Sequence, residues 1–292
     1  MIIKDQPMIK MGKLLSLLIL VTGFLLQSCD KLEAPYAVVK KIKADTTRRA
    51  VLLEDYTGHK CTNCAPAART AHTLEKGYDG QVFVIAVHAG NFAEPDTSHG
   101  QPFKEDFRCA AGNAWYSNPI FKIDGNPKGM VNRVPYNGKI SYIPAQWTDA
   151  VATQAKLQKA AVMSIGNTYN AATRLLTTRV DSRFLICNQG KYNLCVVIQE
   201  DSIIGAQANA IPPDSTPVIY HFVFMDVLRG SLNGPYGEEL TALIDTTSVI
   251  TKTYEYTLDP AWVPKHCKIT AFIANAETYE VMHAARKKVI VN

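Results

Sequence analysis

The feature that most constrains the fold of this chain is a Cys-x-x-Cys pair, Cys61 and Cys64, set between two apolar runs. Residues 50–56 are mostly apolar and predict a buried strand. Residues 65–76 carry small and apolar side chains at helical spacing, which predicts a helix with one buried stripe. Residues 82–87 are apolar at every position, as in a central parallel strand covered on both faces. The segment therefore predicts a β-α-β unit with the dithiol at the start of its helix.

This placement gives the dithiol its expected chemistry. The first turn of a helix presents unpaired N–H groups and a partial positive charge, and both stabilise a thiolate. Cys61 is then expected to be the attacking nucleophile, and Cys64 to resolve the mixed disulfide. Pro66 lacks an N–H, so the helix must begin near Cys64 or bend there, which leaves Cys61 slightly outside it. The alternative is a structural disulfide without redox function.

Two further residues give the segment a resemblance to the thioredoxin superfamily. Pro127 ends an Ile-x-Gly-x-Pro sequence and matches the cis-proline that precedes the third core strand of that family and packs against its Cys-x-x-Cys. Asp55, six residues before Cys61, matches a buried carboxylate that assists proton transfer there. The resemblance implies an α/β thioredoxin-like domain over residues 50–159, with Cys61, Cys64, Asp55 and Pro127 as its catalytic residues.

The chain also departs from that family. Thr62 and Asn63 replace the usual Gly-Pro between the cysteines, so the redox potential does not follow from the resemblance. About thirty residues separate Val87 from Ile120, and they predict an inserted subdomain that could cap the dithiol. A helix is expected over residues 143–158, closing the first domain near residue 159.

Beyond residue 160 the pattern becomes β-rich, with short runs of β-branched and aromatic residues between turn signals. The spacing predicts an antiparallel β-sandwich over residues 160–292. The expected strands are 161–166, 174–180, 193–200, 218–229, 252–258, 267–275 and 280–291.

The N-terminus resembles a bacterial lipoprotein signal. Residues 1–28 contain a basic start and an apolar run, and Leu-Gln-Ser before Cys29 matches a lipobox. The resemblance implies cleavage before Cys29, and acyl chains such as palmitate on its thiol that bury roughly 0.8 kcal/mol per CH₂ in the membrane. Residues 29–49 are polar and read as a flexible tether. The alternative is an uncleaved signal anchor with an ordinary thiol at this position.

Export makes disulfides plausible, because they persist in oxidising compartments. Cys187 and Cys195 flank a turn in a predicted hairpin, so they form either a cross-strand disulfide or two buried free thiols. Cys109 and Cys267 have no obvious partners, and a bond between them across the two domains is one option.

Composition excludes several function classes. Hydrophobic residues make up 47% of the chain and charged residues 20%, which is ordinary globular composition. The formal charge of +5 is mild and scattered, so no nucleic-acid partner is expected. No metal-ligand spacing and no phosphate-binding loop occur, so no metal site and no cofactor are expected. A weaker alternative is copper handling by Cys61, Cys64 and His88.

The order of lipobox, thioredoxin-like domain and β-sandwich resembles the 28-kDa outer-membrane-protein family of lipoproteins from Bacteroidetes. Residues 51–58, 125–133 and 226–234 carry the likeness, together with the Cys-x-x-Cys. The resemblance implies a cell-envelope protein, anchored in the outer membrane through lipid on Cys29, with surface exposure as one option.

Two functions follow from these features. The first is a thiol–disulfide oxidoreductase that uses Cys61 and Cys64 on a protein thiol substrate or redox partner. The second is a non-catalytic surface lipoprotein or adhesin that binds a surface ligand through its β-sandwich.

Overall fold

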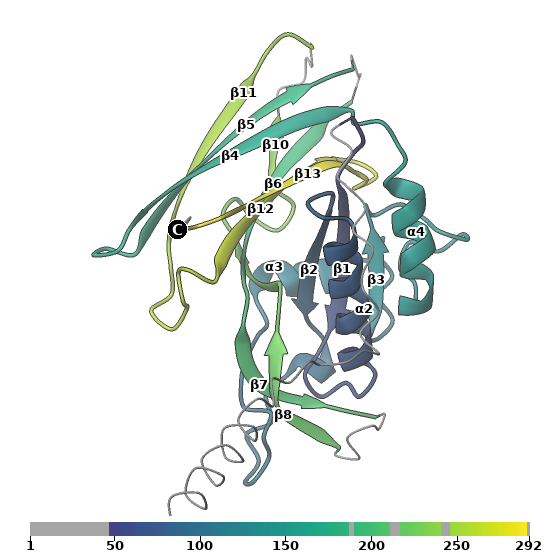
Figure 1. The fold of residues 1–292 in the computed structure, drawn as a ribbon, viewed down its shortest axis with the longest axis vertical. Coiled ribbons are helices and arrows are strands. Elements are labelled where there is room, and N and C mark those ends of the chain that lie inside the picture. Colours follow the sequence, from purple (N-terminus) through teal and green to yellow (C-terminus); the bar gives the residue numbers. More distant parts are fainter. Residues whose placement is uncertain (1–46, 187–189, 211–216, 241–245, 291–292) are drawn as a thin grey trace, which may run out of the picture. The chain divides into compact units, whose positions relative to one another are not determined.

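The structure is a computed structural model that describes residues 47–186, 190–210, 217–240 and 246–290, all within one compact unit. It is a mixed α/β fold with several sheets, built mostly from strands (Figure 1). In this part of the chain, no helix is both long and apolar enough to cross a membrane. The predicted signal, Cys29 and nearly all of the predicted tether lie outside the described residues.

The bounds of the helices are as follows: α2 (Cys64–Gly77), α3 (Ala110–Tyr116) and α4 (Trp147–Gln154), with short 3-10 turns η1 (Asn91–Ala93) and η2 (Pro144–Gln146). The strands are β1 (Val51–Thr57), β2 (Val82–His88), β3 (Lys128–Val131), β4 (Ala161–Asn170), β5 (Leu175–Phe184), β6 (Tyr192–Glu200), β7 (Ile203–Ala208), β8 (Val218–Phe224), β9 (Val227–Ser231), β10 (Glu238–Leu240), β11 (Ile250–Thr257), β12 (Cys267–Asn275) and β13 (Val281–Lys288).

The predicted β-α-β unit is confirmed. β1 runs parallel to β2 along its whole length, from the Val51–Val82 pair to the Thr57–His88 pair. β3 lies on the other side of β1 and runs antiparallel to it. Helix α2 connects β1 and β2 and begins at Cys64, as the position of Pro66 predicts. β1 is therefore a central strand, and all seven of its residues are buried.

Two helices cover one face of these strands. The apolar sides of α2 and α4 pack on inward residues of β1, β2 and β3, with Trp147 fully buried among them. A Cβ on Gly129 would lie 2.5 Å from the Trp147 ring, so only glycine allows this close approach. Helix α3 packs on the opposite face, in a core cluster that also contains residues of β6, β9, β12 and β13. The first half of the chain therefore forms three layers.

The helix expected over residues 143–158 is shorter than predicted. It consists of η2 followed by α4, which ends at Gln154. The side-chain amide of Gln81 donates to the Ala155 carbonyl at 2.8 Å, and Arg48 forms a β-bridge with Gln158. Residues 155–157 form a turn and a bend between these contacts, and the helix does not continue.

Strands from both halves of the sequence share one eight-stranded sheet. Its order is β13-β12-β6-β9-β2-β1-β3, with β10 paired to β6 (Figure 1). β9 joins the first half through a parallel pairing of Val227 with Ala86. The boundary expected near residue 159 therefore falls between segments of a common sheet, and the division into two domains stays a prediction.

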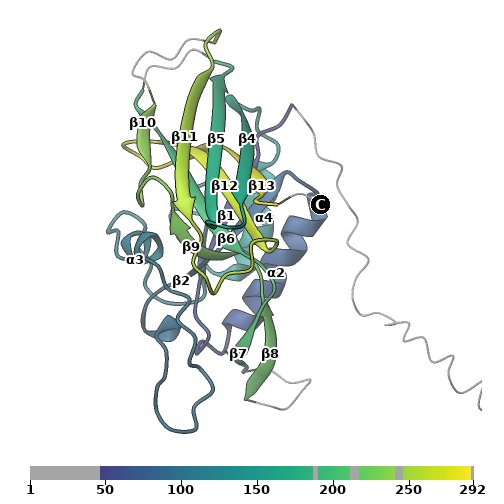
Figure 2. The ribbon, with the colours of Figure 1, turned by 90° about the vertical axis from the view of Figure 1, so that its left-hand side faces the viewer.

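A separate three-stranded sheet, in the order β11-β5-β4, packs across β6, β12 and β13 (Figures 1 and 2). Inward residues of β5 alternate with partly exposed ones, as expected for a strand with one buried face. Six of the seven predicted strands correspond to single observed strands. The prediction of one continuous strand over residues 218–229 is wrong. Asp226 has a positive φ of 58° and separates β8 from β9.

Candidate functional site

The Cys-x-x-Cys pair forms a disulfide at the turn between β1 and α2. The sulfur atoms of Cys61 and Cys64 are bonded, and their Cα atoms lie 5.4 Å apart. Cys61 lies just before the helix and donates its N–H to the Gly58 carbonyl at 3.0 Å, while Cys64 is the first helical residue. The residues are only 3% and 1% exposed. The disulfide therefore lies beneath the surface and not at an open helix end.

The cover over this turn comes from a hairpin that the sequence did not predict. β7 and β8 pair as a two-stranded sheet. The Gln207 amide donates to the Cys61 carbonyl at 2.9 Å, and the Ala208 N–H donates to the His59 carbonyl at 2.7 Å. Ala210 donates in the same way to Thr62 at 3.2 Å. Backbone hydrogen bonds from Ala208 and Ala210 thus attach the hairpin and the residues after β7 to the dithiol turn. The short β7 sequence, Ile-Ile-Gly-Ala-Gln-Ala, contains no local signal of this role.

The segment after β2, expected as a cap, contacts the same turn from another side. The Lys60 N–H donates to the Phe92 carbonyl at 3.0 Å. A Cβ on Gly58 would lie 2.5 Å from the Phe92 backbone, so glycine is required at this approach. The His59 ring stacks on Phe103 with centroids 5.6 Å apart. The dithiol turn is therefore enclosed by two segments distant in sequence.

Asp55 lies on β1, 1% exposed, on the side of a cavity of about 270 Å³. Its Oδ1 has no hydrogen-bond partner among the described residues. Burial raises the pKa of this carboxyl from 3.8 to about 8. The side chain therefore holds its proton at neutral pH. The same cavity is lined by His72, His88 and Gln207, which places Asp55 on the side of β1 that the hairpin covers.

Pro127 is joined to Asn126 by a cis peptide bond, directly before β3. The Asn126 side-chain amide donates to the carbonyls of Thr57 and Ala89, each at 3.0 Å, and so ties this loop to the ends of β1 and β2. Asp55 pairs with Gly129, two residues after the proline. Pro127 also borders a groove of about 310 Å³ whose other lining residues are Asn63, Pro66, Ala67, Thr70, Ile143 and Pro144. The structure therefore brings the proline and the dithiol turn together.

The copper alternative finds no matching cluster. Among the described residues, the group whose ligand atoms lie within 4.8 Å of one another is His72, Glu75 and Asp226, without either cysteine or His88. Arg286 forms ion pairs with both carboxylates of that group. Burial lowers the pKa of His88 to about 3, and its ring packs on Phe107 and Phe224. His88 is therefore a neutral, buried imidazole.

The remaining cysteines in the described part of the chain are free. Cys109 and Cys267 are both thiols, so a bond between them is excluded. Cys195 is a buried thiol, and its suggested partner Cys187 lies outside the described residues. Burial raises the pKa of Cys195 and of Cys267 to about 12, which keeps both thiols protonated and unreactive.

A buried ion pair beside Asp55 does not follow from any local sequence pattern. Arg133 donates two hydrogen bonds to the Glu54 carboxylate, at 2.7 and 2.9 Å, and both side chains are buried. The guanidinium lies 4.8 to 5.1 Å from three ring centroids, those of Trp115, Phe121 and Phe272. The two residues are 79 positions apart, so no local pattern could pair them.

The fold and the site define a mixed α/β protein with a buried, disulfide-bonded Cys-x-x-Cys pair. The sequence model of the family described as "Outer membrane protein Omp28" matches residues 113–292. Because this match covers more than half of the chain, the chain belongs to the Omp28 family. The predicted family and the predicted outer-membrane location are confirmed. The matched segment begins after the dithiol, so membership carries no statement about its chemistry.

The comparison with solved structures gives one likeness of overall fold, to HBP35. HBP35 of Porphyromonas gingivalis is 17% identical, with 84% of this chain and 76% of that chain covered and a TM-score of 0.59. A domain of the outer membrane lipoprotein Omp28 from Porphyromonas gingivalis is 20% identical, with 45% of this chain and 88% of that chain covered and a TM-score of 0.31. A comparison with curated proteins finds no match.

Proposed function

We propose that this protein is an outer-membrane lipoprotein that exchanges thiols and disulfides through Cys61 and Cys64 in a thioredoxin-like arrangement. The observation that carries the proposal is the protonated, unpaired Asp55 on the strand that leads into the dithiol turn. A buried carboxyl kept neutral at pH 7 is unusual and is typical of sites that transfer protons. The cis peptide at Pro127, on the strand paired with β1, supports the same interpretation.

The topology gives independent support. β1 lies between a parallel and an antiparallel neighbour, and α2 and α4 share one face of the sheet. This is the arrangement that the thioredoxin resemblance implies for residues 50–159. The packing of β4, β5 and β11 across β6, β12 and β13 supports the proposed sandwich over residues 160–292.

The proposed step begins with the oxidised protein. A thiolate of a protein substrate attacks the Cys61 sulfur, and Cys64 leaves and takes the proton of Asp55. The second substrate thiolate then attacks the substrate sulfur bonded to Cys61, and Cys61 leaves as a thiolate. The substrate gains a disulfide and the protein gains two electrons. The reverse sequence reduces a substrate, with Asp55 accepting the proton of Cys64.

A substrate must reach Cys61, which is nearly covered. The groove beside Pro127 is mostly apolar, and Ile143 on its border is 50% exposed. We propose that an extended substrate segment lies in this groove while the hairpin of β7 and β8 moves away from the turn. The hydrogen bonds from Gln207 and Ala208 are the contacts that this movement breaks.

A disulfide-exchange assay with a dithiol peptide tests the proposal. Cys61→Ser is expected to abolish turnover. Reduced Cys64→Ser is expected to trap a mixed disulfide when it is given the disulfide form of the peptide, because Cys61 attacks a peptide sulfur and no Cys64 thiol remains to release it. Cys109→Ser, which alters a free thiol, is the control and is expected to retain turnover. Alkylation of reduced Cys61 at graded pH adds a second readout. A thiol pKa near the free value of about 8.5, together with no turnover, would overturn the proposal.

A second candidate is a non-catalytic surface lipoprotein or adhesin that binds a ligand through its β-sandwich. The near-complete burial of the disulfide favours it, because a structural disulfide needs no access. In cells, a Cys61→Ser, Cys64→Ser variant that keeps every phenotype of the parent at normal protein level would support this candidate. Loss of the phenotype would support exchange chemistry.

The lipid anchor on Cys29 is a separate proposal. It rests on the lipobox and agrees with the outer-membrane family. Labelled palmitate is expected to enter the parent protein and not a Cys29→Ala variant. Protease added to intact cells is expected to cleave the protein if it is exposed on the surface, and to leave it intact if it faces the periplasm.

A further inference from the structure

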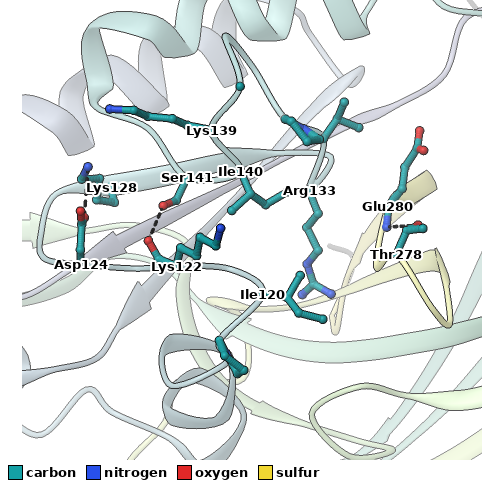
Figure 3. A pocket seen from close by; sticks show the side chains of 14 residues that line it. Ile120, Lys122, Asp124, Lys128, Arg133, Lys139, Ile140, Ser141, Thr278 and Glu280 are labelled. Carbon is teal, nitrogen blue, oxygen red and sulfur yellow. Dashed lines mark hydrogen bonds and ion pairs between the residues drawn. The ribbon is translucent and has the colours of Figure 1, made fainter.

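A cavity of about 950 Å³ lies apart from the dithiol, between the loop before β3, the loop after β3 and the turn before β13 (Figure 3). Its volume lies in the range of volumes found for binding sites of small organic ligands. Its lining residues are Pro119, Ile120, Lys122, Asp124, Lys128, Arg133, Val134, Pro135, Gly138, Lys139, Ile140, Ser141, Thr278 and Glu280. None of these residues is assigned to the exchange reaction.

The charge of the cavity is positive. Lys128 is paired with Asp124 at 3.1 Å, and Arg133 is paired with Glu54. Lys122 and Lys139 are exposed, and neither makes an ion pair with any described residue. Figure 3 shows the Lys122 ammonium pointing toward Ile140, and the Lys139 ammonium pointing outward on the side of Lys128. Two ammonium groups that form no ion pair with the described residues therefore border the cavity, and Lys139 is also attracted at longer range by Asp124.

The carboxylate on the opposite side is already engaged. Glu280 lies across the cavity from Lys139 in Figure 3 and forms an ion pair with Arg49 at 3.3 Å. It therefore does not neutralise the two lysines. An entering anion meets positive charge on one side and a paired carboxylate on the other.

Apolar side chains form much of the remaining surface. Ile120 is 47% exposed, and Ile140 points into the same space between the lysines and Arg133 (Figure 3). Pro119, Val134 and Pro135 add further apolar surface. Apolar area left open beside cations suits a ligand with both an apolar part and a negative charge.

The backbone holds this arrangement in place. Lys122 has a positive φ of 50°, and the Ser141 hydroxyl donates to its carbonyl at 2.8 Å, joining the two loops. Arg133 and Asn137 have positive φ values of 52° and 50°. Such conformations are costly for residues with a side chain, and they cluster where a structure fixes a ligand site.

We propose that this cavity binds a small organic anion, with its carboxylate or phosphate against Lys122 and its apolar part against Ile120 and Ile140, while Lys139 adds positive charge to the border of the cavity. The proposal does not depend on the exchange reaction, because no residue is shared. Decanoate and decyl phosphate are suitable probes of the two acid groups. Decanol tests the need for charge, and acetate tests the need for the apolar part.

Isothermal titration calorimetry on the full chain provides the test. Decanoate or decyl phosphate is expected to bind one site, and to bind more weakly as salt is added. A Lys122→Gln, Lys139→Gln variant is expected to lose about tenfold in affinity or more, since one charge-assisted contact and a second positive charge at the border are removed. Lys265→Gln, Lys287→Gln changes the net charge equally at exposed positions outside the cavity and is expected to bind as the parent does.

Ile120→Asn tests the apolar half and is expected to weaken decanoate about threefold or more without changing the salt dependence. Three results would overturn the proposal. They are the absence of saturable binding by both acids, equal binding of decanol, and equal loss in the two lysine variants. Circular dichroism of each variant shows that a loss of binding does not come from unfolding.

Discussion

Glu54 and Asp55 are neighbouring carboxyl groups on one buried strand, and they have opposite environments. Glu54 receives two hydrogen bonds from Arg133, inside a group of three aromatic rings. Asp55 has an unpaired oxygen and borders a cavity. Successive side chains of a strand point to opposite faces, so one strand can present both. Equal burial therefore produces a structural group on one face and a candidate proton carrier on the other.

The largest expected effect comes from breaking the paired face. Arg133→Met leaves the Glu54 carboxylate buried without a partner and is expected to lower the free energy of unfolding by about 4 kcal/mol. Urea denaturation at pH 7 measures it. Arg179→Met removes an exposed arginine from its pair with Asp181 and is expected to cost below about 0.5 kcal/mol. Equal losses in the two variants would show that the buried pair is not structural.

A substitution on the unpaired face, at Asp55, is expected to raise the free energy of unfolding, whereas Arg133→Met lowers it. The pKa of Asp55 is about 8 in the folded protein, against 3.8 for the ordinary carboxyl. Between these values the unfolded chain binds fewer protons, so this group lowers stability as pH rises from 4 to 8. Asp55→Asn is expected to raise the free energy of unfolding by roughly 3 kcal/mol at pH 7, and by little at pH 4.

Urea denaturation of Asp55→Asn across this pH range measures the gain. Glu54→Gln provides the comparison, since it weakens the ion pair with Arg133 and is expected to destabilise. A gain for Asp55→Asn that does not grow with pH would contradict a raised pKa. Slower thiol–disulfide exchange by Asp55→Asn would link the proton held by Asp55 to the proposed function.

His88 lies on the same face as Asp55 but has the opposite pH dependence. Burial lowers its pKa to about 3, whereas an ordinary histidine titrates at 6.5. The unfolded chain therefore binds the extra proton, and stability from this group falls as pH drops below 6.5. His88→Phe keeps a ring among Phe107 and Phe224 and is expected to gain roughly 2 kcal/mol at pH 5 and little at pH 8.

Chemical denaturation of His88→Phe at pH 5 and pH 8 measures this difference. Because Asp55 and His88 act in opposite directions between pH 4 and 6.5, the parent protein is expected to show a flatter profile than either variant. A gain in His88→Phe at pH 8 as large as that at pH 5 would indicate better packing instead of removed titration.

The contrast between the faces also explains what the sequence could predict. β1, α2 and β2 follow from local apolar patterns, and the positions of Asp55 and Pro127 follow from a resemblance. The Arg133 partner of Glu54 lies 79 positions away, and the Gln207 contact with Cys61 spans 146 positions. The turn at Asp226 breaks an apolar run that reads as one strand. Local periodicity contains no information on such contacts, which form only when distant strands meet.

The smallest expected effect concerns the cover of the unpaired face. Gln207→Ala removes the side-chain hydrogen bonds to the carbonyls of Gly58 and Cys61. Loss of about 1 kcal/mol from this contact shifts the equilibrium between the closed and the opened hairpin roughly fivefold toward the opened form. The Cys61–Cys64 disulfide is therefore expected to be reduced by dithiothreitol about fivefold faster. Gln158→Ala, an exposed glutamine after α4, is the control.

Rates of thiol appearance, followed with a chromogenic disulfide reagent, measure this change. If the hairpin governs access to Cys61, the rate rises while the free energy of unfolding changes by about 1 kcal/mol or less. An unchanged rate would show that reagents reach the disulfide by the groove beside Pro127 without movement of the hairpin. Either result identifies the side from which a substrate approaches, because these two segments border the dithiol turn from different directions.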